Sequence, residues 1–174
     1  SLTIPFKRLN TEVIFHASTR FVIEFLQAKV DSLLYKSYSD DDARKTLFYR
    51  SNSDGTYRFR GNYNGSSSFN LFAGIATDEV YLIRSECAAR NGNKDSAMAD
   101  LNRLLLKRWK DSGAFIPMMA SSPTEAIEIV LQERRKELAF RAGLRWTDLR
   151  RLAQNDGSLL SLRRVIDGQS YILP

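Results

Sequence analysis

The clearest pattern along the chain is a pair of apolar stripes at helical spacing between residues 77 and 110. Apolar residues recur at i, i+3, i+7 and i+8 and then at i, i+4, i+7 and i+8: Val80, Ile83, Cys87 and Ala88, followed by Ala97, Leu101, Leu104 and Leu105. Asn91 and Gly92 separate the two stripes. The pattern predicts an antiparallel helical hairpin with Cys87 on its buried side.

A second pair of helices is expected between residues 122 and 153. Ser122-Pro123-Thr124-Glu125 combines a capping box with proline at the first helical position, which is a strong helix start. Four apolar residues follow on one stripe: Ile127, Val130, Leu131 and Leu138. Gly143 is suited to end this helix. Three further apolar residues predict a short last helix with the tryptophan at a core position: Trp146, Leu149 and Ala153.

The first 75 residues mix extended and irregular segments. Residues 12–15 form a β-branched and aromatic run that is typical of a strand. The polar pair at 18–19 offers a helix start, and apolar residues between positions 22 and 33 predict an amphipathic helix of about four turns. From 51 to 68 the composition shifts to Ser, Asn and Gly with several aromatic residues, which predicts loops or a ragged hairpin.

Together these elements predict a mainly α fold of antiparallel helical hairpins with a minor β or irregular portion. We expect two parts: a segment of strand, helix and aromatic loop over residues 1–75, and two helical hairpins over residues 76–174. Each hairpin is about 34 residues long, which is the size of a tetratricopeptide unit. The consensus spacing of that repeat is not convincingly present, so the likeness is one of architecture only.

Composition and charge narrow the class of function. The 174 residues are 43% apolar and 26% charged, which is a globular composition, and no apolar run reaches the length of a membrane-spanning helix. The net charge is +6, and most of the excess lies between residues 131 and 164. Basic residues in that stretch alternate with carboxylates and accompany no nucleic-acid-binding motif, so we expect no nucleic-acid partner.

Few side chains suit metal or covalent chemistry. His16 is the single histidine and Cys87 is the single cysteine, so the sequence offers neither a set of metal ligands nor a nucleophilic triad. No glycine-rich phosphate loop occurs either. We therefore expect no metal and no cofactor.

Glu133 and Glu137 lie one helical turn apart, a spacing that could present paired carboxylates for glycoside hydrolysis. Four basic residues surround them: Arg134, Arg135, Lys136 and Arg141. Nearby cations lower carboxylate pKa values, which is the opposite of what a general acid requires. We interpret the pair as structural, with Arg134 on the core stripe held by carboxylates, and we expect no enzymatic activity.

One segment has the composition of a sugar-binding loop. Sugar sites combine aromatic platforms with amide and guanidinium groups that fix the orientation of the ligand. The residues of this kind are Tyr57, Arg58, Asn62, Tyr63 and Asn64. Two interpretations stay open: they bind a ligand, or the aromatic residues pack the loop against the helices.

Two stretches carry a resemblance to a known family. Residues 79–86 read Glu-Val-Tyr-Leu-Ile-Arg-Ser-Glu, and Gly92, Ala97 and Leu101-Asn102 follow. Residues 133–140 read Glu-Arg-Arg-Lys-Glu-Leu-Ala-Phe, and residues 143–151 read Gly-Leu-Arg-Trp-Thr-Asp-Leu-Arg-Arg. Both resemble the signature of the SusD/RagB family of outer-membrane glycan-binding lipoproteins, and residues 10–15, 42–44 and 171–174 are similar to its weaker landmarks.

The resemblance marks a set of residues that we expect to be structural. They are Glu79, Tyr81, Arg84, Glu86, Asn102, Glu133, Arg134, Arg135, Glu137, Leu138, Phe140, Gly143, Arg145, Trp146, Asp148, Leu149 and Arg151. Within the set we expect an intramolecular ion-pair network of Glu133, Arg134, Glu137, Arg145 and Asp148. Residues 141–143 depart from the family pattern by one extra residue, which predicts a different turn between the last two helices.

The resemblance also implies a function. Members of the family capture oligosaccharide or polysaccharide without catalysis at the extracellular face of the outer membrane, where a lipid anchor holds them, and deliver it to a SusC-like TonB-dependent transporter. They are several hundred residues long and have an N-terminal helical-repeat half, so we expect this chain to match their C-terminal portion. A helical-repeat scaffold that binds protein or peptide is the alternative, because the same fold supports it equally well.

Overall fold

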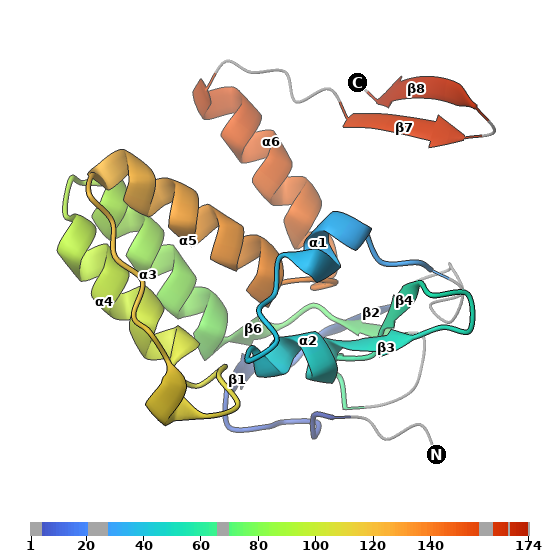
Figure 1. Ribbon diagram of the computed structural model, residues 1–174, viewed down its shortest axis with the longest axis horizontal. Coiled ribbons are helices and arrows are strands. Elements are labelled where there is room, and N and C mark those ends of the chain that lie inside the picture. The colour runs from blue at the N-terminus through green and yellow to red at the C-terminus, as the bar shows by residue number, and fades with distance from the viewer. Residues whose placement is uncertain (1–4, 21–27, 66–69, 157–161, 167, 174) are drawn as a thin grey trace.

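The computed structural model describes residues 5–20, 28–65, 70–156, 162–166 and 168–173 (Figure 1). The elements in chain order are β1 (Val13–Phe15), β2 (Ser18–Arg20), α1 (Ser32–Lys36), α2 (Ala43–Phe48), β3 (Tyr49–Ser51), β4 (Tyr57–Phe59), β5 (Asn70–Phe72), β6 (Ile75–Ala76), α3 (Thr77–Arg90), α4 (Lys94–Leu105), the 3-10 turn η1 (Ser112–Ala114), α5 (Pro123–Glu137), α6 (Leu144–Asp156), β7 (Leu162–Ile166) and β8 (Gln169–Leu173). Long helices follow a segment of short strands and helices. The predicted mainly α fold with a minor β portion is therefore confirmed.

Helices α3 and α4 form the predicted hairpin. The turn between them contains Gly92 at φ 82°, a conformation that glycine adopts without strain. The Asn93 side chain then caps α4 by accepting a hydrogen bond of 3.0 Å from the Ser96 amide. Helix α5 packs against both, and the three helices share one apolar core: Leu82, Ala89, Ala97, Met98, Leu101, Leu104, Leu105, Ala126, Val130 and Leu138.

The buried face of α3 differs from the predicted one. Val80 and Ile83 are 44% and 48% exposed, and Cys87 is exposed as well, so the prediction that this stripe and its cysteine are buried is wrong. The buried side carries Leu82 and Ala89, together with polar residues that find partners. The neighbouring helices pack against the side of α3 that carries small and hydrogen-bonded residues. The apolar spacing in the sequence therefore did not mark the buried side.

The connection between α5 and α6 also differs from the expectation. Helix α5 starts as predicted, with the Ser122 hydroxyl accepting from the Glu125 amide at 3.1 Å, but it ends at Glu137 rather than near Gly143. Phe140 and Ala142 in the turn have φ values of 59° and 41°, in the left-handed region that non-glycine residues rarely adopt. The departure from the family pattern thus coincides with an unusual turn.

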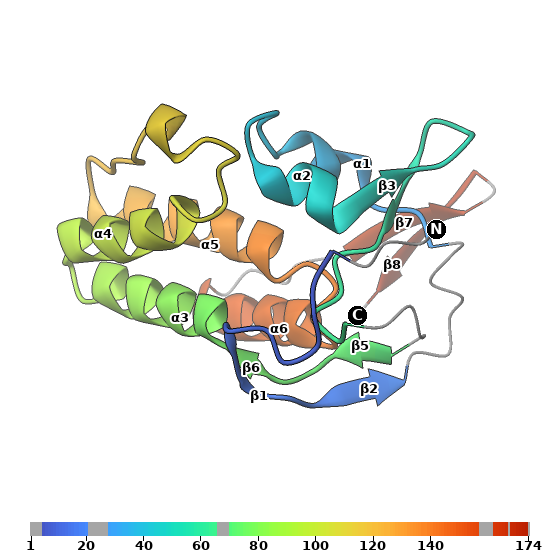
Figure 2. The same ribbon diagram turned by 90° about the horizontal axis from the view of Figure 1, so that it is seen from below.

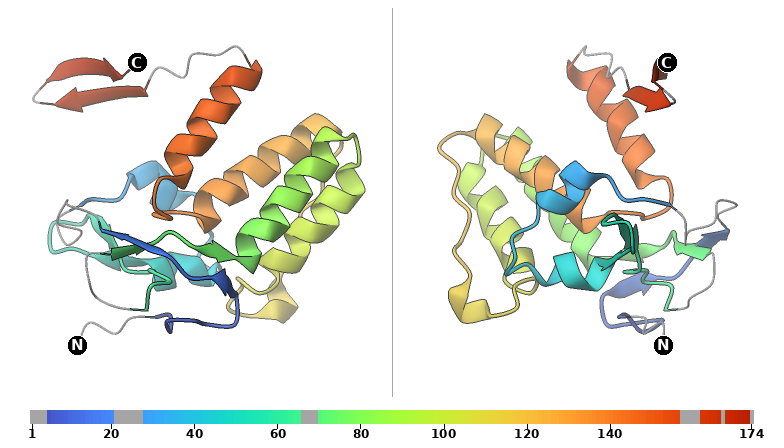
Figure 3. Two further views of the ribbon diagram at one scale, coloured as in Figure 1. Left: turned by 180° about the vertical axis from the view of Figure 1, so that it is seen from behind. Right: turned by 45° about the vertical axis from the view of Figure 1, so that its right-hand side comes forward.

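Helix α6 leaves this turn at an open angle to α5 (Figures 1 and 3). Trp146 on its first turns is 49% exposed, so its predicted core position is wrong. Leu144 packs against the core of α3, α4 and α5, and Asp148 is buried. The helix faces the rest of the protein with its charged residues, and its aromatic residue points outward.

The first 75 residues form two-stranded antiparallel pairs. Strand β1 matches the predicted strand and pairs with β6. Strand β2 pairs with β5, so the helix predicted to start at 18–19 is wrong at its beginning, and residues 21–27 lie outside the described residues. The expected ragged hairpin is β3 with β4, in which Tyr49 pairs with Phe59. Helix α2 and the C-terminal hairpin β7–β8 were not predicted.

The turn between α5 and α6 lies between two groups of elements (Figure 2). On one side are α1, α2 and the β3–β4 hairpin, and on the other are β5 and β6. Phe140 stacks on Phe59 of β4 with ring centroids 4.5 Å apart, while the Arg141 guanidinium lies 5.0 Å from the Phe72 ring of β5. The signature residues thus connect the helices to the segment of short strands. None of the described helices has both the length and the apolar character that crossing a bilayer demands.

Candidate functional site

Part of the predicted ligand-binding loop lies at the surface. Tyr57 in β4 is half-buried and stacks on Tyr35 of α1, with ring centroids 3.5 Å apart and planes at 16°. Arg58 is half-buried in the same strand. The Asn62 side chain is committed to the backbone, because it donates to the Asn70 carbonyl at 2.5 Å and accepts from two amides.

The other two residues of that loop lie inside the protein. Tyr63 is 3% exposed, its hydroxyl donates to Glu12 at 2.8 Å, and the Arg141 guanidinium lies 4.1 Å from the centre of its ring. Asn64 is 7% exposed. Their burial contradicts a direct ligand contact by these two side chains, and the packing interpretation describes Tyr63 correctly.

A buried ion-pair cluster joins α2 to the end of α5. Arg44 is 1% exposed and donates to Asp42 at 2.7 Å, to Glu133 at 2.8 Å and to Glu137 at 2.9 Å. Arg108, in the segment that follows α4, contacts the second oxygen of Glu137 at 2.8 Å. Two cations thus hold one fully buried carboxylate, and the arrangement fixes three helices relative to one another.

The electrostatics of this cluster bear on catalysis. Burial raises the pKa of Glu137, but the Arg108 and Arg44 guanidinium groups outweigh burial and hold that pKa well below its usual range. Glu133 accepts from Lys136 at 2.5 Å as well as from Arg44. A glycosidase acid must carry a proton near neutral pH, and Glu137 carries none.

A second cluster attaches α6 to α3 and α5. Arg134 donates to Asp148 at 2.8 Å and to Glu79 at 3.4 Å. Arg151 contacts the other oxygen of Asp148 at 2.9 Å and reaches Glu86 at 2.7 Å. Because α6 exposes its tryptophan, these charged contacts supply much of what positions the helix.

The expected network is therefore present as two clusters. Glu133 and Glu137 belong to the first, Arg134 and Asp148 belong to the second, and Arg145 belongs to neither. Sequence reasoning missed Arg44 and Arg108 as the cations that hold the glutamates. The resemblance at residues 42–44 was a signal for the first, and nothing in the sequence pointed to Arg108.

The remaining signature residues serve local packing. Arg84 pairs with Asp100 at the surface and lies over the Tyr81 ring, and the Asn102 side chain exchanges two hydrogen bonds with the Met118 backbone at 2.8 Å. Leu138 is buried in the helical core, Leu149 is half-buried, and Gly143 directly precedes α6. Arg135 reaches Asp31 at 2.7 Å.

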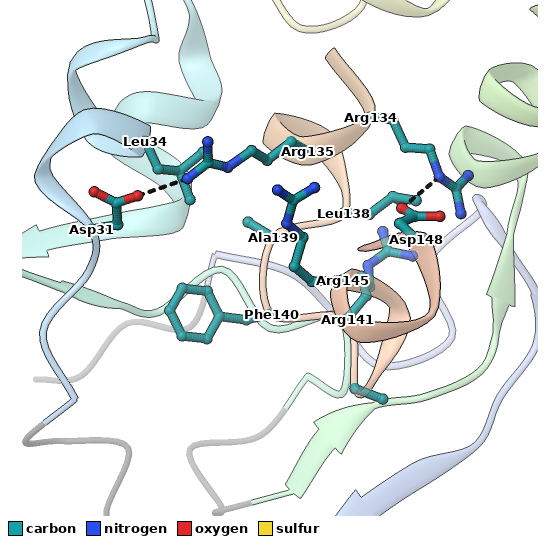
Figure 4. A pocket seen from close by; sticks show the side chains of 11 residues that line it. Asp31, Leu34, Arg134, Arg135, Leu138, Ala139, Phe140, Arg141, Arg145 and Asp148 are labelled. Carbon is teal, nitrogen blue, oxygen red and sulfur yellow. Dashed lines mark hydrogen bonds and ion pairs between the residues drawn. The ribbon is translucent and has the colours of Figure 1, made fainter. Parts of the chain in front are cut away.

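A pocket of about 280 Å³ opens beside these clusters (Figure 4). It lies between α1, the last turn of α5, the α5–α6 turn and the start of α6. Its charged lining consists of Asp31, Arg134, Arg135, Arg141, Arg145 and Asp148, and its apolar lining includes Leu34, Leu138 and Phe140. Helix α1 contributes to two surfaces, since Leu34 lines the pocket and the next residue, Tyr35, stacks on Tyr57.

The backbone of the pocket is strained where it meets the turn. Phe140 and Ala142 both line the pocket, and left-handed non-glycine residues cost on the order of 1–3 kcal/mol each. The stack of Phe140 on Phe59 and the ion pair of Arg141 with Asp78 hold the turn on either side. Strain that surrounding contacts maintain is common at binding sites.

Acidification should weaken the attachment of α6. Burial raises the pKa of Glu86, but Arg151 and Arg90 outweigh burial and lower it. The contribution of Glu86 to stability is therefore complete above about pH 4.3, the usual glutamate pKa, and is lost as pH falls through its folded-state pKa. We expect the difference in free energy of unfolding between wild type and Glu86→Gln, measured by urea titration, to shrink toward zero as pH falls below about 4.3. A constant difference would show that the charge of Glu86 contributes nothing.

Within the part of the chain that the structure describes, no group of three or more His, Cys, Asp or Glu side chains is placed to hold a metal ion. The described cysteine, Cys87, lies on the exposed side of α3. Among the described residues, features that could receive a ligand include the arginine-lined pocket and the stacked pair Tyr35–Tyr57.

Comparison with known proteins agrees with the resemblance in the sequence. The family model described as the SusD family matches residues 77–169, which is more than half of the chain. No curated protein sequence matched. Among solved structures, a SusD-like carbohydrate binding protein from Bacteroides vulgatus ATCC 8482 has a TM-score of 0.54 at 21% identity, and the match covers 83% of this chain and 32% of that one.

A SusD superfamily protein from Bacteroides fragilis NCTC 9343 has a TM-score of 0.50 at 20% identity, with 70% of this chain and 29% of that one covered. The chain thus spans about a third of the length of these relatives. At such identities the structures establish a shared fold. Since the family model covers the α3–α6 signature whose contacts are described above, the chain belongs to the SusD family.

Proposed function

We propose that this protein takes part in the non-catalytic binding of oligosaccharide or polysaccharide at the extracellular face of the outer membrane. We further propose that a lipid anchor attaches the protein there and that the glycan passes to a SusC-like TonB-dependent transporter. The observation that supports glycan binding is the family match over α3–α6, together with the fold shared with a SusD-like carbohydrate binding protein.

The side-chain chemistry supports binding rather than catalysis. Glu133 and Glu137, the pair with glycosidase spacing, are both held by buried cations. By contrast, the stacked pair Tyr35–Tyr57 offers an aromatic ring, and a pocket partly lined by α1 offers several guanidinium groups. Aromatic faces stack on sugar rings, and guanidinium groups bind their oxygen atoms.

An array that carries neutral and acidic oligosaccharides tests this proposal with the 174-residue chain. We expect at least one glycan class to bind, and we expect binding to weaken in Tyr57→Ala but not in Trp109→Ala, an aromatic substitution in the segment that follows α4. Binding of no glycan, or equal effects of the two substitutions, would contradict a glycan surface at Tyr57.

The exposed stripe on α3 favours a second candidate, a surface that binds protein. Val80, Ile83 and Cys87 present an apolar face that the rest of the described chain leaves open. The same array can carry peptides as well as sugars. Binding of peptides with no binding of any glycan would favour this scaffold function over the first proposal.

A further inference from the structure

The pocket beside α1 carries more positive than negative charge. Four arginines and two aspartates line it. Arg134 is committed to Asp148, which also accepts from Arg151. Arg141 is 5% exposed and is committed to Asp78. These two guanidinium groups are fixed parts of the wall, so the excess charge rests on the other two arginines.

Arg145 is the arginine of this wall without an ion pair. No hydrogen bond or ion pair joins it to another residue of the described ranges, and it is exposed. Burial of part of its side chain, and then the charge of Arg135, lower the pKa of its guanidinium group. Figure 4 shows the Arg145 side chain extending toward Arg135. Two cations of like charge therefore face one pocket, an arrangement that an anion would stabilise.

Arg135 can contribute to such a site with little loss of stability. Its ion pair with Asp31 has an N–O distance of 2.7 Å, but the two side chains are 41% and 46% exposed. Ion pairs this exposed are screened by water and contribute little to stability. The guanidinium group can thus turn from Asp31 to an incoming carboxylate.

Arg134 adds a hydrogen-bond donor that has no acceptor within the described ranges. Its Nη1 atom is buried and has no hydrogen-bond partner among the described residues, although the other nitrogens bind Asp148 and Glu79. A buried donor without an acceptor is unfavourable. An oxygen atom held in the pocket would bring an acceptor to the wall that Arg134 forms.

The opposite part of the lining is apolar. Leu34, Leu138, Ala139 and Phe140 contribute to the pocket, and Phe140 is held in place by its stack on Phe59. The volume of about 280 Å³ is just below the range of about 300–1,000 Å³ for ligand pockets. This size suits one sugar ring rather than a segment of a chain. An apolar wall receives the C–H face of such a ring, while the guanidinium groups receive charged oxygen atoms.

We propose that this pocket binds the carboxylate of an acidic sugar, a uronic acid residue of a glycan, with Arg145 and Arg135 facing the carboxylate and the Leu34–Phe140 wall facing the ring. Planar guanidinium groups bind carboxylates through two parallel hydrogen bonds. This inference rests on the proposed glycan-binding function and narrows it to acidic glycans. The pocket then supplies selectivity by charge.

The test compares two sugars that differ at one group. Glucuronate carries a carboxylate where glucose carries a hydroxymethyl group, so the ratio of their dissociation constants isolates the contribution of the charge. We expect the 174-residue chain, by calorimetry or NMR titration at low salt, to bind glucuronate at least about tenfold more tightly than glucose. The preference should decline at about 1 M salt, where the Debye length is about 3 Å.

Substitutions test whether the preference for glucuronate over glucose comes from the pocket. Arg145→Gln should reduce it by about tenfold, because one charge-assisted hydrogen bond is lost. Arg145 makes no ion pair with a described residue, so the variant should unfold at the wild-type temperature. Arg150→Gln is the matched control, since Arg150 is an exposed arginine of the same helix that does not line the pocket. An Arg145→Gln variant that keeps the full preference overturns the proposal.

The remaining outcomes separate this inference from the function on which it rests. Binding of neutral oligosaccharides with no preference for glucuronate leaves glycan binding in place and overturns the acidic-sugar site. Binding of no sugar overturns both. Displacement of glucuronate by an equal concentration of acetate shows recognition of a carboxylate alone and overturns the role of the sugar ring. Equal binding of a sulfated sugar likewise overturns selectivity for the carboxylate.

Discussion

Replacing Arg44 with alanine is expected to lower the free energy of unfolding by about 3–5 kcal/mol. The substitution leaves three carboxylates without their shared cation: Asp42, Glu133 and Glu137. Glu137 is 1% exposed, so water cannot replace the lost contact. Because small domains are stable by only about 5–15 kcal/mol, a loss of this size is measurable as a large shift in the midpoint of urea unfolding.

Arg84→Ala is the matched control for Arg44→Ala. Arg84 also pairs with an aspartate, but its side chain is 59% exposed. Exposed pairs contribute about 0–1 kcal/mol, so we expect a change within that range. Similar losses in the two variants would mean that burial does not determine the strength of the Arg44 cluster.

The same cluster explains why a pair of glutamates with catalytic spacing is compatible with a binding protein. Spacing along a helix brings Glu133 and Glu137 to one face, but the cations that pair with them include Arg44 of α2 and Arg108 of the segment that follows α4. The two glutamates therefore hold the helices together through ion pairs with these arginines.

Local signals in the sequence predicted the helical half well. The hairpin of α3 and α4 depends on an Asn-Gly-Asn turn, and the start of α5 depends on the capping box at Ser122, and both are interactions between residues close in sequence. The buried face of α3 could not be predicted in the same way. It depends on which side neighbouring helices cover, and α6 contributes both an ion pair with Glu86 and Leu144, which packs against the helical core.

Long-range contacts account for the other differences. Ser18–Arg20 carry a polar pair suited to a helix start, yet their strand pairs with Asn70–Phe72, about fifty residues away. Arg44 and Arg108 meet Glu137 from distant positions in the chain. The pocket needs α1, the end of α5 and the start of α6 together, and Arg145 showed its free guanidinium group only once the partners of its neighbours were known.

The tyrosines of the predicted loop should separate into one structural residue and one surface residue. Tyr63→Ala is expected to lower the free energy of unfolding by about 3–5 kcal/mol, the usual cost of deleting a buried aromatic side chain. The Tyr63 ring packs against Phe6 with centroids 4.6 Å apart and lies under the Arg141 guanidinium group. Its removal opens a cavity and leaves Glu12 without the hydroxyl donor.

Tyr57→Ala should lower the free energy of unfolding by about 1–2 kcal/mol, because the half-buried Tyr57 loses its stack on Tyr35 and its packing against the aromatic core of β3 and β4. The comparison is made by urea unfolding of both variants, followed by titration of each folded protein with a glycan that binds the wild type. If Tyr57 lies on the binding surface, Tyr57→Ala weakens glycan binding while the protein stays folded.

Tyr63→Phe keeps the ring and removes the hydroxyl, so it should lower the free energy of unfolding by about 1 kcal/mol and leave glycan affinity unchanged. Loss of affinity in Tyr63→Phe without loss of stability would place the ligand at the interior residue instead, and the surface around Tyr57 would then be the wrong one.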